Sequence, residues 1–400
     1  MVEVSIILPV YNAARWLDDC LQSVLEQRYL GDLELSIYND ASTDSSKAIL
    51  NKWMASLEAH GIHVILTDHP SDSSLPKGVG FAKNRAIEKS SGKYLCFLDA
   101  DDVMHKDRIV EQLEVARRHT RSIIGSCFHR EPVGSTQRFT DWANGLSQHQ
   151  LLTQIYTSHG PTVIMPTWFC SRNVYDTVGS FHEGGKGVPE DLVFFYKHLE
   201  VGGTIVRVDQ DLMMYRYHSD ATTFSVSEST IWQLRLDFLE KRVLSNWERF
   251  TIWNAGKQGR RFYRSLSESN RQKVAMFCDV DERKISKGYY TYEESTAIVK
   301  PKIPVVHFRD AQPPFIICVK LDLTKGDFEN NLKSLNLKEV DKLEFEEAQY
   351  KQYQELVYGM VWRDKAVWFK NQETVTYKGY SNQTNLVGYP DYSTVRFPCL

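Results

Sequence analysis

Short apolar runs alternate with stretches of helical spacing over the first hundred residues. Four of the apolar runs predict buried strands, at residues 4–10, 33–39, 63–67 and 94–98. Between them, Ile49, Trp53 and Leu57 recur every fourth residue and predict a helix that Ser42 caps, and residues 79–90 predict another. Strands that alternate with helices of this length predict an α/β fold with a doubly wound, mostly parallel sheet.

Polar side chains follow three of these predicted strands at the point where each strand ends. Tyr11 and Asn12 follow the first strand, Asp40 follows the second, and Asp99–Asp102 follow the fourth. In doubly wound sheets, ligands bind beyond the carboxyl ends of the strands. Each group alone is an ordinary turn or helix-cap residue, but three groups on neighbouring strands favour a binding site.

The segment Asp99-Ala100-Asp101 places two carboxylates close together behind a buried strand. Neighbouring carboxylates raise each other's pKa unless a cation lies between them. Mg²⁺ and Mn²⁺ prefer oxygen ligands and commonly bridge one or two carboxylates to phosphate oxygens of a substrate. We therefore expect Mn²⁺ or Mg²⁺ with a diphosphate here, whereas Asp102 and Asp107 are also typical of an acidic helix start.

Composition narrows the class of protein further. The chain has 400 residues, 42% of them hydrophobic, which is enough for two domains with real cores. The formal charge of −3 argues against a uniformly basic nucleic-acid coat. No signal sequence and no apolar stretch of about 18 residues is present, and the seven cysteines lack a metal-type spacing. We expect a cytoplasmic protein that does not enter a membrane.

Six sequence blocks follow one another in the order typical of one enzyme family. They are Ser5-Ile-Ile-Leu-Pro-Val-Tyr-Asn12, Asn39-Asp-Ala-Ser-Thr-Asp44, Ala82-Lys-Asn-Arg-Ala86, Phe97-Leu-Asp-Ala-Asp-Asp102, Pro189-Glu-Asp191 and Tyr215-Arg-Tyr-His218. Together they resemble family 2 glycosyltransferases of the GT-A fold, over roughly residues 1–225. The resemblance implies a metal-dependent enzyme that uses a UDP-sugar.

The resemblance also implies a role for each matched residue. The implied donor-binding residues are Pro9, Tyr11, Asn12, Asp40, Lys83, Asn84, Asp99, Ala100 and Asp101. Tyr11 would stack on the uracil ring, and Asp40 would bind the edge of that ring. Lys83 stands where the family has arginine, and lysine makes no bidentate contact. Asp101 and His218 would hold the metal, although a histidine after a strand is also an ordinary surface residue.

The implied catalytic base is Asp191, with Glu190 as its close competitor. A sugar-acceptor hydroxyl is a poor nucleophile until a positioned carboxylate takes its proton, which agrees with that role. Adjacent residues on a helix point in different directions, so only one of the two carboxylates can face the acceptor. The expected reaction is an inverting single displacement. An acidic helix cap without a catalytic role is the alternative.

The remainder of the chain predicts further parts. After the 1–225 domain we expect a helical connector over 226–250, a small Rossmann-like domain over 251–345 and a tail of unknown role over 346–400. The segment Gly256-Lys-Gln-Gly259 lacks the full three-glycine dinucleotide fingerprint.

Basic residues concentrate between residues 235 and 273, a segment that contains ten Lys or Arg and only four Asp or Glu. The candidate RNA-binding residues are Lys257, Arg260, Arg261 and Arg264. The aromatic residues Trp247, Trp253, Phe262 and Tyr263 lie among these charges and could stack on bases. A basic helix face whose aromatic side chains lie in the core is the alternative.

The blocks Gly160–Arg172 and Phe250–Arg261 belong to a longer stretch, residues 1–345, that resembles an animal glycosyltransferase acting on tRNA. That resemblance implies transfer of galactose from UDP-galactose to queuosine at the wobble position of tRNA-Tyr. Two alternatives stay open. One is a UDP-N-acetylglucosamine-dependent β-1,3-N-acetylglucosaminyltransferase that acts on a glycan, and the other is a non-catalytic RNA-binding protein on a glycosyltransferase scaffold.

Overall fold

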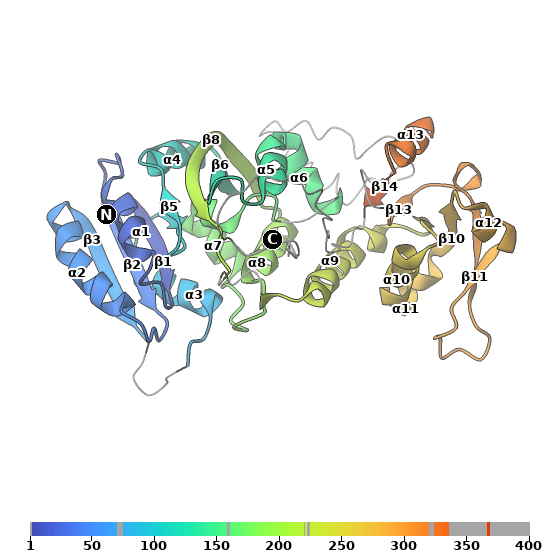
Figure 1. Cartoon of the computed structure of the whole chain (residues 1–400), viewed down its shortest axis with the longest axis horizontal. Helices are drawn as coiled ribbons and strands as arrows, with labels where there is room; N and C mark the ends of the chain where they lie inside the picture. The colour runs from blue at the N-terminus through green and yellow to red at the C-terminus, as the bar shows by residue number, and fades with distance from the viewer. Residues whose placement is uncertain are drawn as a thin grey trace, which may run out of the picture. The chain divides into compact units, whose positions relative to one another are not determined.

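The computed structural model describes residues 2–69, 75–157, 161–219, 221, 225–319, 324–335 and 366–368 (Figure 1). The chain divides into two compact units, with the division between Val226 and Ser227. Most of the expected tail at 346–400 lies outside the described residues, apart from one short strand at 366–368.

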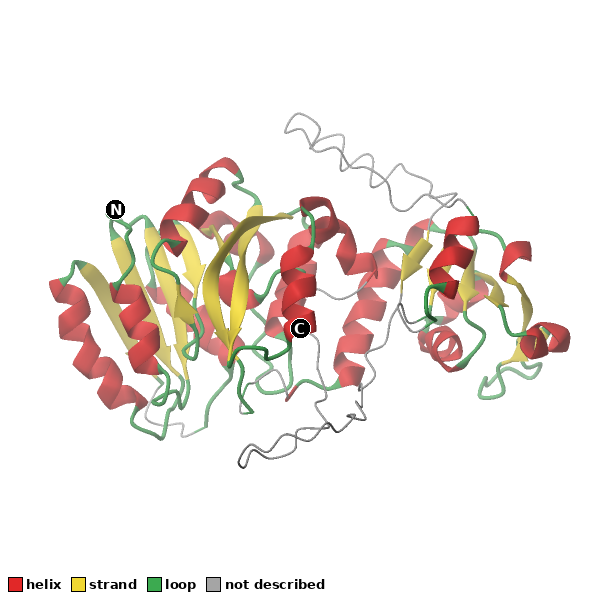
Figure 2. Ribbon diagram, turned by 45° about the horizontal axis from the view of Figure 1, so that its top comes forward, coloured by secondary structure: helices red, strands yellow, loops and turns green. Residues whose placement is uncertain are grey.

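An eight-stranded sheet forms the centre of the first unit (Figure 2). Its strands are β1 (Val4–Val10), β2 (Leu33–Asn39), β3 (Ile62–Asp68), β4 (Tyr94–Phe97), β5 (Val103–Met104), β6 (Ser122–Glu131), β7 (Phe169–Ser171) and β8 (Thr204–Arg216), in the spatial order β3-β2-β1-β4-β7-β6-β8-β5. The first four strands run parallel, as expected from the sequence. β7 is antiparallel to β4 and β6, and β5 is antiparallel to β8, so the sheet is mixed but mostly parallel.

Helices cover this sheet and bury its central strands. They are α1 (Leu17–Leu25), α2 (Ser46–Ala59), α3 (Val79–Lys89), α4 (Arg108–Arg118), α5 (Gln137–Gly145), α6 (Gln148–Thr157), α7 (Arg172–Val178) and α8 (Glu190–Glu200), with the short 3-10 turn η1 (Met165–Thr167). Every residue of β1 and β2 is buried, because helices pack on the sheet. The expected helix cap at Ser42 is wrong: α2 begins at Ser46, and Ser42 instead accepts a hydrogen bond from the Asn12 backbone.

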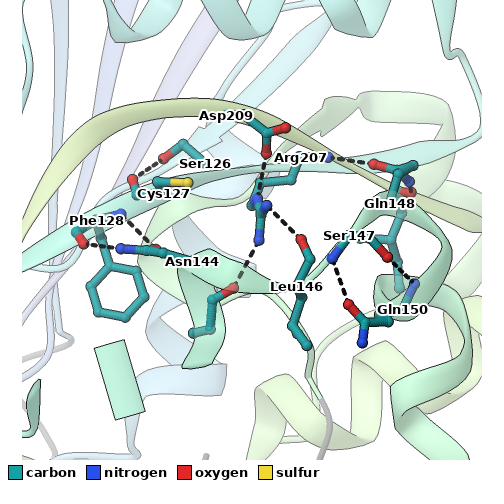
Figure 3. Close-up of polar contacts among 12 residues, drawn as sticks. Ser126, Cys127, Phe128, Asn144, Leu146, Ser147, Gln148, Gln150, Arg207 and Asp209 are labelled. Atoms are coloured by element: carbon teal, nitrogen blue, oxygen red, sulfur yellow. Dashed lines mark hydrogen bonds and ion pairs between the residues drawn. The ribbon is translucent and has the colours of Figure 1, made fainter. Parts of the chain in front are cut away.

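Arg207 of β8 attaches the turn between α5 and α6 to the sheet (Figure 3). Its guanidinium donates to Ala143 O at 2.8 Å and to Leu146 O at 2.6 Å, and its Nε donates to Asp209 at 2.7 Å. Carbonyl groups at the end of a helix lack partners within that helix, so Arg207 satisfies the end of α5.

The second unit is a smaller α/β structure with its own six-stranded sheet. Its strands are β9 (Phe250–Trp253), β10 (Val274–Asp279), β11 (Tyr289–Thr291), β12 (Lys302–His307), β13 (Phe315–Ile317) and β14 (Ala366–Trp368). Its helices are α9 (Glu228–Arg242), α10 (Lys257–Ser265), α11 (Glu268–Gln272), α12 (Glu282–Lys287) and α13 (Asp327–Ser334). Two short 3-10 turns, η3 (Leu244–Asn246) and η4 (Phe308–Asp310), complete the unit as far as it is described. The order is β11-β12-β10-β9-β13-β14, and only β11 pairs in the antiparallel sense. This is the second, smaller domain that the sequence predicted. The residues expected as a connector, 226–250, contribute α9 to this unit.

None of the helices in the described part of the chain has both the length and the apolar character needed to cross a membrane. Cys96 and Cys318 are buried free thiols, as their apolar surroundings in the sequence suggest, whereas Cys127 is partly exposed.

Candidate active site

The polar residues that follow β1, β2 and β4 meet at one edge of the main sheet. β1 lies between β2 and β4, and all three strands run in the same direction. Val10 pairs with Asn39 in register, and Ile7 pairs with Phe97. The groups around Tyr11, Asp40 and Asp99 therefore come together, as the sequence predicted.

The loop after β1 is ordered by Asn12. This residue has a positive φ of 48°, and its Oδ1 accepts hydrogen bonds from the backbone nitrogens of Thr43 at 2.7 Å and Asp44 at 3.3 Å. Its side chain therefore joins the loops that follow β1 and β2. Tyr11 beside it is 50% exposed, which leaves its ring accessible to a ligand, whereas Pro9 lies buried within β1.

Asp40 is only 2% exposed, and its own chain satisfies both carboxylate oxygens. Oδ1 and Oδ2 accept from Lys77 N at 3.1 and 2.9 Å, and Oδ2 also accepts from Gly78 N at 2.7 Å. The Nδ1 atom of His69 lies 3.3 Å from Oδ1. Asp40 thus holds the start of α3 against the end of β2.

Asn84 of α3 is fully buried, and its amide is used entirely for internal contacts. Its Oδ1 accepts from Phe181 N at 2.9 Å and Tyr175 OH at 3.0 Å, while its Nδ2 donates to Phe181 O and to Glu183. Asn84 therefore fixes the segment that leads into α8. The neighbouring Lys83 is also buried and points toward the carboxylates described below.

The carboxylates after β4 have different surroundings. Asp102 is fully buried, and its Oδ1 accepts from Arg216 N at 2.9 Å. Burial, together with Asp101 and Asp99, raises its pKa well above the usual range. Burial raises the pKa of Asp99 to about 6, since the attraction of Lys83 only partly offsets it and Asp101 adds to it.

Asp101 contacts a histidine from the far end of the first unit. His218 Nε2 lies 2.7 Å from Asp101 Oδ2, which is a hydrogen-bonding distance, so the structure brings together the two residues that were expected to hold the metal. Arg216, two residues earlier, donates from Nε to Asp101 O at 2.8 Å. The ends of β4 and β8 are thereby joined.

A divalent metal fits this pair in part. Within the described ranges, no three His, Cys, Asp or Glu side chains converge in the way a protein-only metal site requires. One carboxylate and one imidazole are ligands that Mn²⁺ accepts, and His218 Nδ1 is buried without a hydrogen-bond partner. Two protein ligands suit an ion whose other positions are filled by substrate phosphates and water.

Asp191 and Glu190 form the first turn of α8, and both are buried, at 4% and 8% exposure. Glu190 Oε1 accepts from Lys83 Nζ at 2.8 Å, whereas Asp191 Oδ1 accepts only from Leu192 N, at 2.8 Å, among the hydrogen bonds of the described residues. Burial, and after it the charge of Glu190, raise the pKa of Asp191 to about 7, although Lys83 opposes the rise. A carboxylate with this pKa can take up a proton near neutral pH.

The four expected RNA-binding residues differ in their exposure and in their contacts with the rest of the protein. Arg260 Nε donates to Ala255 O, Arg261 pairs with Glu228 at 2.7 Å, and Arg264 pairs with Glu294 at 3.5 Å. The exposed residue of the four is Lys257.

Of the two interpretations of the aromatic side chains in this region, the structure supports the one that places them in the core and not the one in which they stack on bases. The four residues concerned are at most 4% exposed and lie in the hydrophobic cores of the second unit, namely Trp247, Trp253, Phe262 and Tyr263. Hydrophobic burial outweighed their position among charged neighbours in the sequence.

Sequence reasoning missed two arginines. Arg216 belongs to the Tyr215–His218 block, so its place in that block could have indicated that it lies at the site. Arg108 is fully buried on α4 and donates to Phe97 O and Trp168 O, beneath the carboxylate segment. Its sequence position, one residue after an expected acidic helix start, gave no sign of this.

The sequence model of the family described as Glycosyl transferase family 2 matches residues 5–179. Residues 5–179 form a glycosyltransferase family 2 domain. Together with the mixed, mostly parallel sheet, this match confirms the expected α/β GT-A fold. The donor-side residues from Pro9 to Asp101 lie inside the family 2 match, whereas Glu190, Asp191 and His218 follow it.

The family 2 domain is similar to "Putative teichuronic acid biosynthesis glycosyltransferase TuaG" of Bacillus subtilis. The two are 38% identical over 111 residues, which are 28% of this chain and 40% of TuaG. The matched segment thus spans less than half of the length of TuaG.

Solved structures that resemble the chain include TarS 1–349 of S. aureus in complex with UDP-GlcNAc. It has a TM-score of 0.47 and 18% identity, over 67% of this chain and 71% of that chain. Another is the mannosyltransferase PcManGT of Pyrobaculum calidifontis in complex with GDP-Man and Mn²⁺. It has a TM-score of 0.45 and 17% identity, over 60% of this chain and 63% of that chain.

Proposed function

We propose that this protein is an inverting, metal-dependent glycosyltransferase that transfers galactose from UDP-galactose to queuosine at the wobble position of tRNA-Tyr. The observation that carries the catalytic part is the buried Asp191, whose pKa is raised to about 7 by burial and by Glu190. The resemblance over residues 1–345 supports the choice of donor sugar and of tRNA acceptor.

On the donor side, Tyr11 offers an exposed ring for the nucleobase, beside the buried Asp40. Asp99 follows the neighbouring strand β4 and would contact the ribose of the donor. Asp101 and His218 would together hold a Mn²⁺ or Mg²⁺ ion. That ion would supply positive charge to the diphosphate as it leaves. Arg216 keeps Asp101 in place through the backbone oxygen of that residue.

On the acceptor side, Asp191 takes the proton from the attacking hydroxyl of the cyclopentene-diol. The acceptor oxygen then forms a bond to the anomeric carbon as the bond from that carbon to the diphosphate oxygen breaks. The electron pair of the broken bond leaves with UDP, and the proton stays on Asp191. Displacement on one face inverts the anomeric configuration. Glu190 is less suited to this role, because Lys83 already donates to it.

The test is transfer of radiolabelled sugar to purified queuosine-containing tRNA. The donors are UDP-galactose, UDP-N-acetylglucosamine, UDP-mannose and GDP-mannose, each with and without Mn²⁺. We expect labelling from UDP-galactose alone, dependent on the metal and absent in Asp191→Asn. tRNA with unmodified guanosine at the wobble position serves as the matched control acceptor.

Other outcomes would decide against this proposal. Labelling of a glycan from UDP-N-acetylglucosamine, with none of tRNA, would support the N-acetylglucosaminyltransferase alternative. Binding of tRNA without turnover of any donor would support the non-catalytic alternative.

A further inference from the structure

Lys83 has an environment that is unusual for a lysine. Its side chain is 2% exposed on α3, and its ammonium donates to Glu190 Oε1 at 2.8 Å and lies 3.8 Å from Asp99 Oδ1. The ring of Phe181 lies 5.8 Å from the same nitrogen. Lysine is rarely fully buried unless it is paired, so the two carboxylates account for its position.

The pairs of Lys83 join three elements that are far apart in the sequence. Glu190 opens α8, which carries Asp191, and Asp99 lies on the donor side after β4. Burial lowers the pKa of Lys83, but Glu190 and Asp99 outweigh it, and the net pKa is raised. Lys83 is therefore a permanent cation.

We propose that Lys83 is a positioning residue, which holds Glu190 and Asp99 so that Asp191 alone remains to accept the acceptor proton. This role replaces the donor-binding role that the sequence suggested for Lys83, and it rests on the proposed function for the reaction that Asp191 performs. The charged groups that act on Asp191 are Glu190 on its own helix, Lys83 on α3 and Asp99 after β4. Lys83 is the cation among them.

The variants are Lys83→Met, Lys83→Arg, Glu190→Gln and the double variant Lys83→Met/Glu190→Gln. An opposite charge at this range lowers a carboxyl pKa by about 1–3 units. In Lys83→Met we therefore expect the acidic limb of the kcat profile to move up by at least about one pH unit, with kcat at least about 5-fold lower at pH 7 and recovered at pH 9. Glu190→Gln should move the limb down, and the double variant should lie between the two single variants.

Donor affinity separates this role from a donor contact. We expect the KM for UDP-galactose to stay within about 2-fold in Lys83→Met, and Lys83→Arg, which keeps the charge, to restore part of the pH 7 rate. A rise of 10-fold or more in KM, with an unchanged pH profile, would overturn the proposal. Lys89→Met, an exposed residue on the same helix, is the matched control.

A readout without turnover separates this proposal from the proposed function. Carbon-13 NMR of aspartate-labelled protein follows the Asp191 carboxyl, which is assigned by its absence in Asp191→Asn. If the wild type transfers no galactose to tRNA, the proposed function fails, yet the carboxyl titration still tests Lys83. An Asp191 titration midpoint that does not move in either Lys83→Met or Glu190→Gln would contradict the positioning role.

Discussion

Replacement of Asp191 by asparagine should remove turnover and make the protein more stable at alkaline pH. The change keeps the shape of the side chain and removes a negative charge that is 4% exposed. Burial first, and Glu190 second, raise the pKa of Asp191 from 3.8 to about 7. One pKa unit corresponds to about 1.4 kcal/mol, so the ionised carboxylate costs the folded state up to about 4 kcal/mol.

The sign of this effect follows from proton linkage. Between pH 4 and pH 7 the folded protein keeps the Asp191 proton, whereas the unfolded chain has already lost it. The Asp191 contribution to stability therefore falls as pH rises through this range, and the full cost is present above pH 7. Asparagine avoids that cost but loses the charge-assisted hydrogen bond from Leu192 N. We therefore expect a net gain of about 2 kcal/mol at pH 8 and a smaller one at pH 5.

Thermal unfolding at pH 5 and pH 8 measures this difference. For a unit of this size, about 2 kcal/mol corresponds to a rise in Tm of about 4–8 °C at pH 8. Asp176→Asn, an exposed residue on α7, is the control and should change Tm by less than about 1 °C. If Asp191→Asn lowers Tm at pH 8, or raises it equally at both pH values, the buried-charge argument is wrong.

Three further predictions concern the neighbouring parts of the structure. Asn84→Ala leaves Phe181 N and Phe181 O without a buried partner, so Tm should fall by about 5–10 °C in thermal unfolding, and an unchanged Tm would contradict the contacts. His218→Ala should raise the Mn²⁺ concentration for half-maximal turnover at least about 10-fold, and an unchanged Mn²⁺ titration would remove His218 from the metal site. Lys257→Glu should weaken tRNA binding in filter assays and lower the salt slope by about 1, while equal affinity across salt concentrations would place the tRNA elsewhere.

The grouping of the site was predictable because it follows from the direction of the strands. Parallel neighbours place their carboxyl ends at one edge, so Tyr11, Asp40 and Asp99 had to converge once the strands were recognised. The antiparallel strand β7 was not predictable in this way, because it has only three residues. Its pairing depends on β4, more than 70 positions earlier in the chain.

The hydrogen-bond partners of the individual polar side chains were much less predictable. Asn12 and Asn84 were both expected at the donor, yet their amides bind backbone and side-chain groups about 30 and 90 positions away. Partners that distant leave no local pattern in a sequence. The same holds for Trp253 and Phe262, whose charged neighbours concealed their place in the core.

The two adjacent acids at the start of α8 show what the structure adds to a motif. In the sequence Glu190 and Asp191 are near equivalents, and the helix position alone favours neither as the base. The structure differentiates them by one contact, because Lys83 donates to Glu190 and leaves Asp191 without a cation in direct contact among the described residues. If Asp191 is the base, as proposed, its selection over Glu190 depends on a residue more than 100 positions earlier. An arginine in place of Lys83 would bring a larger, forked group into the same buried space, so the lysine itself is part of the proposed distinction between the two acids.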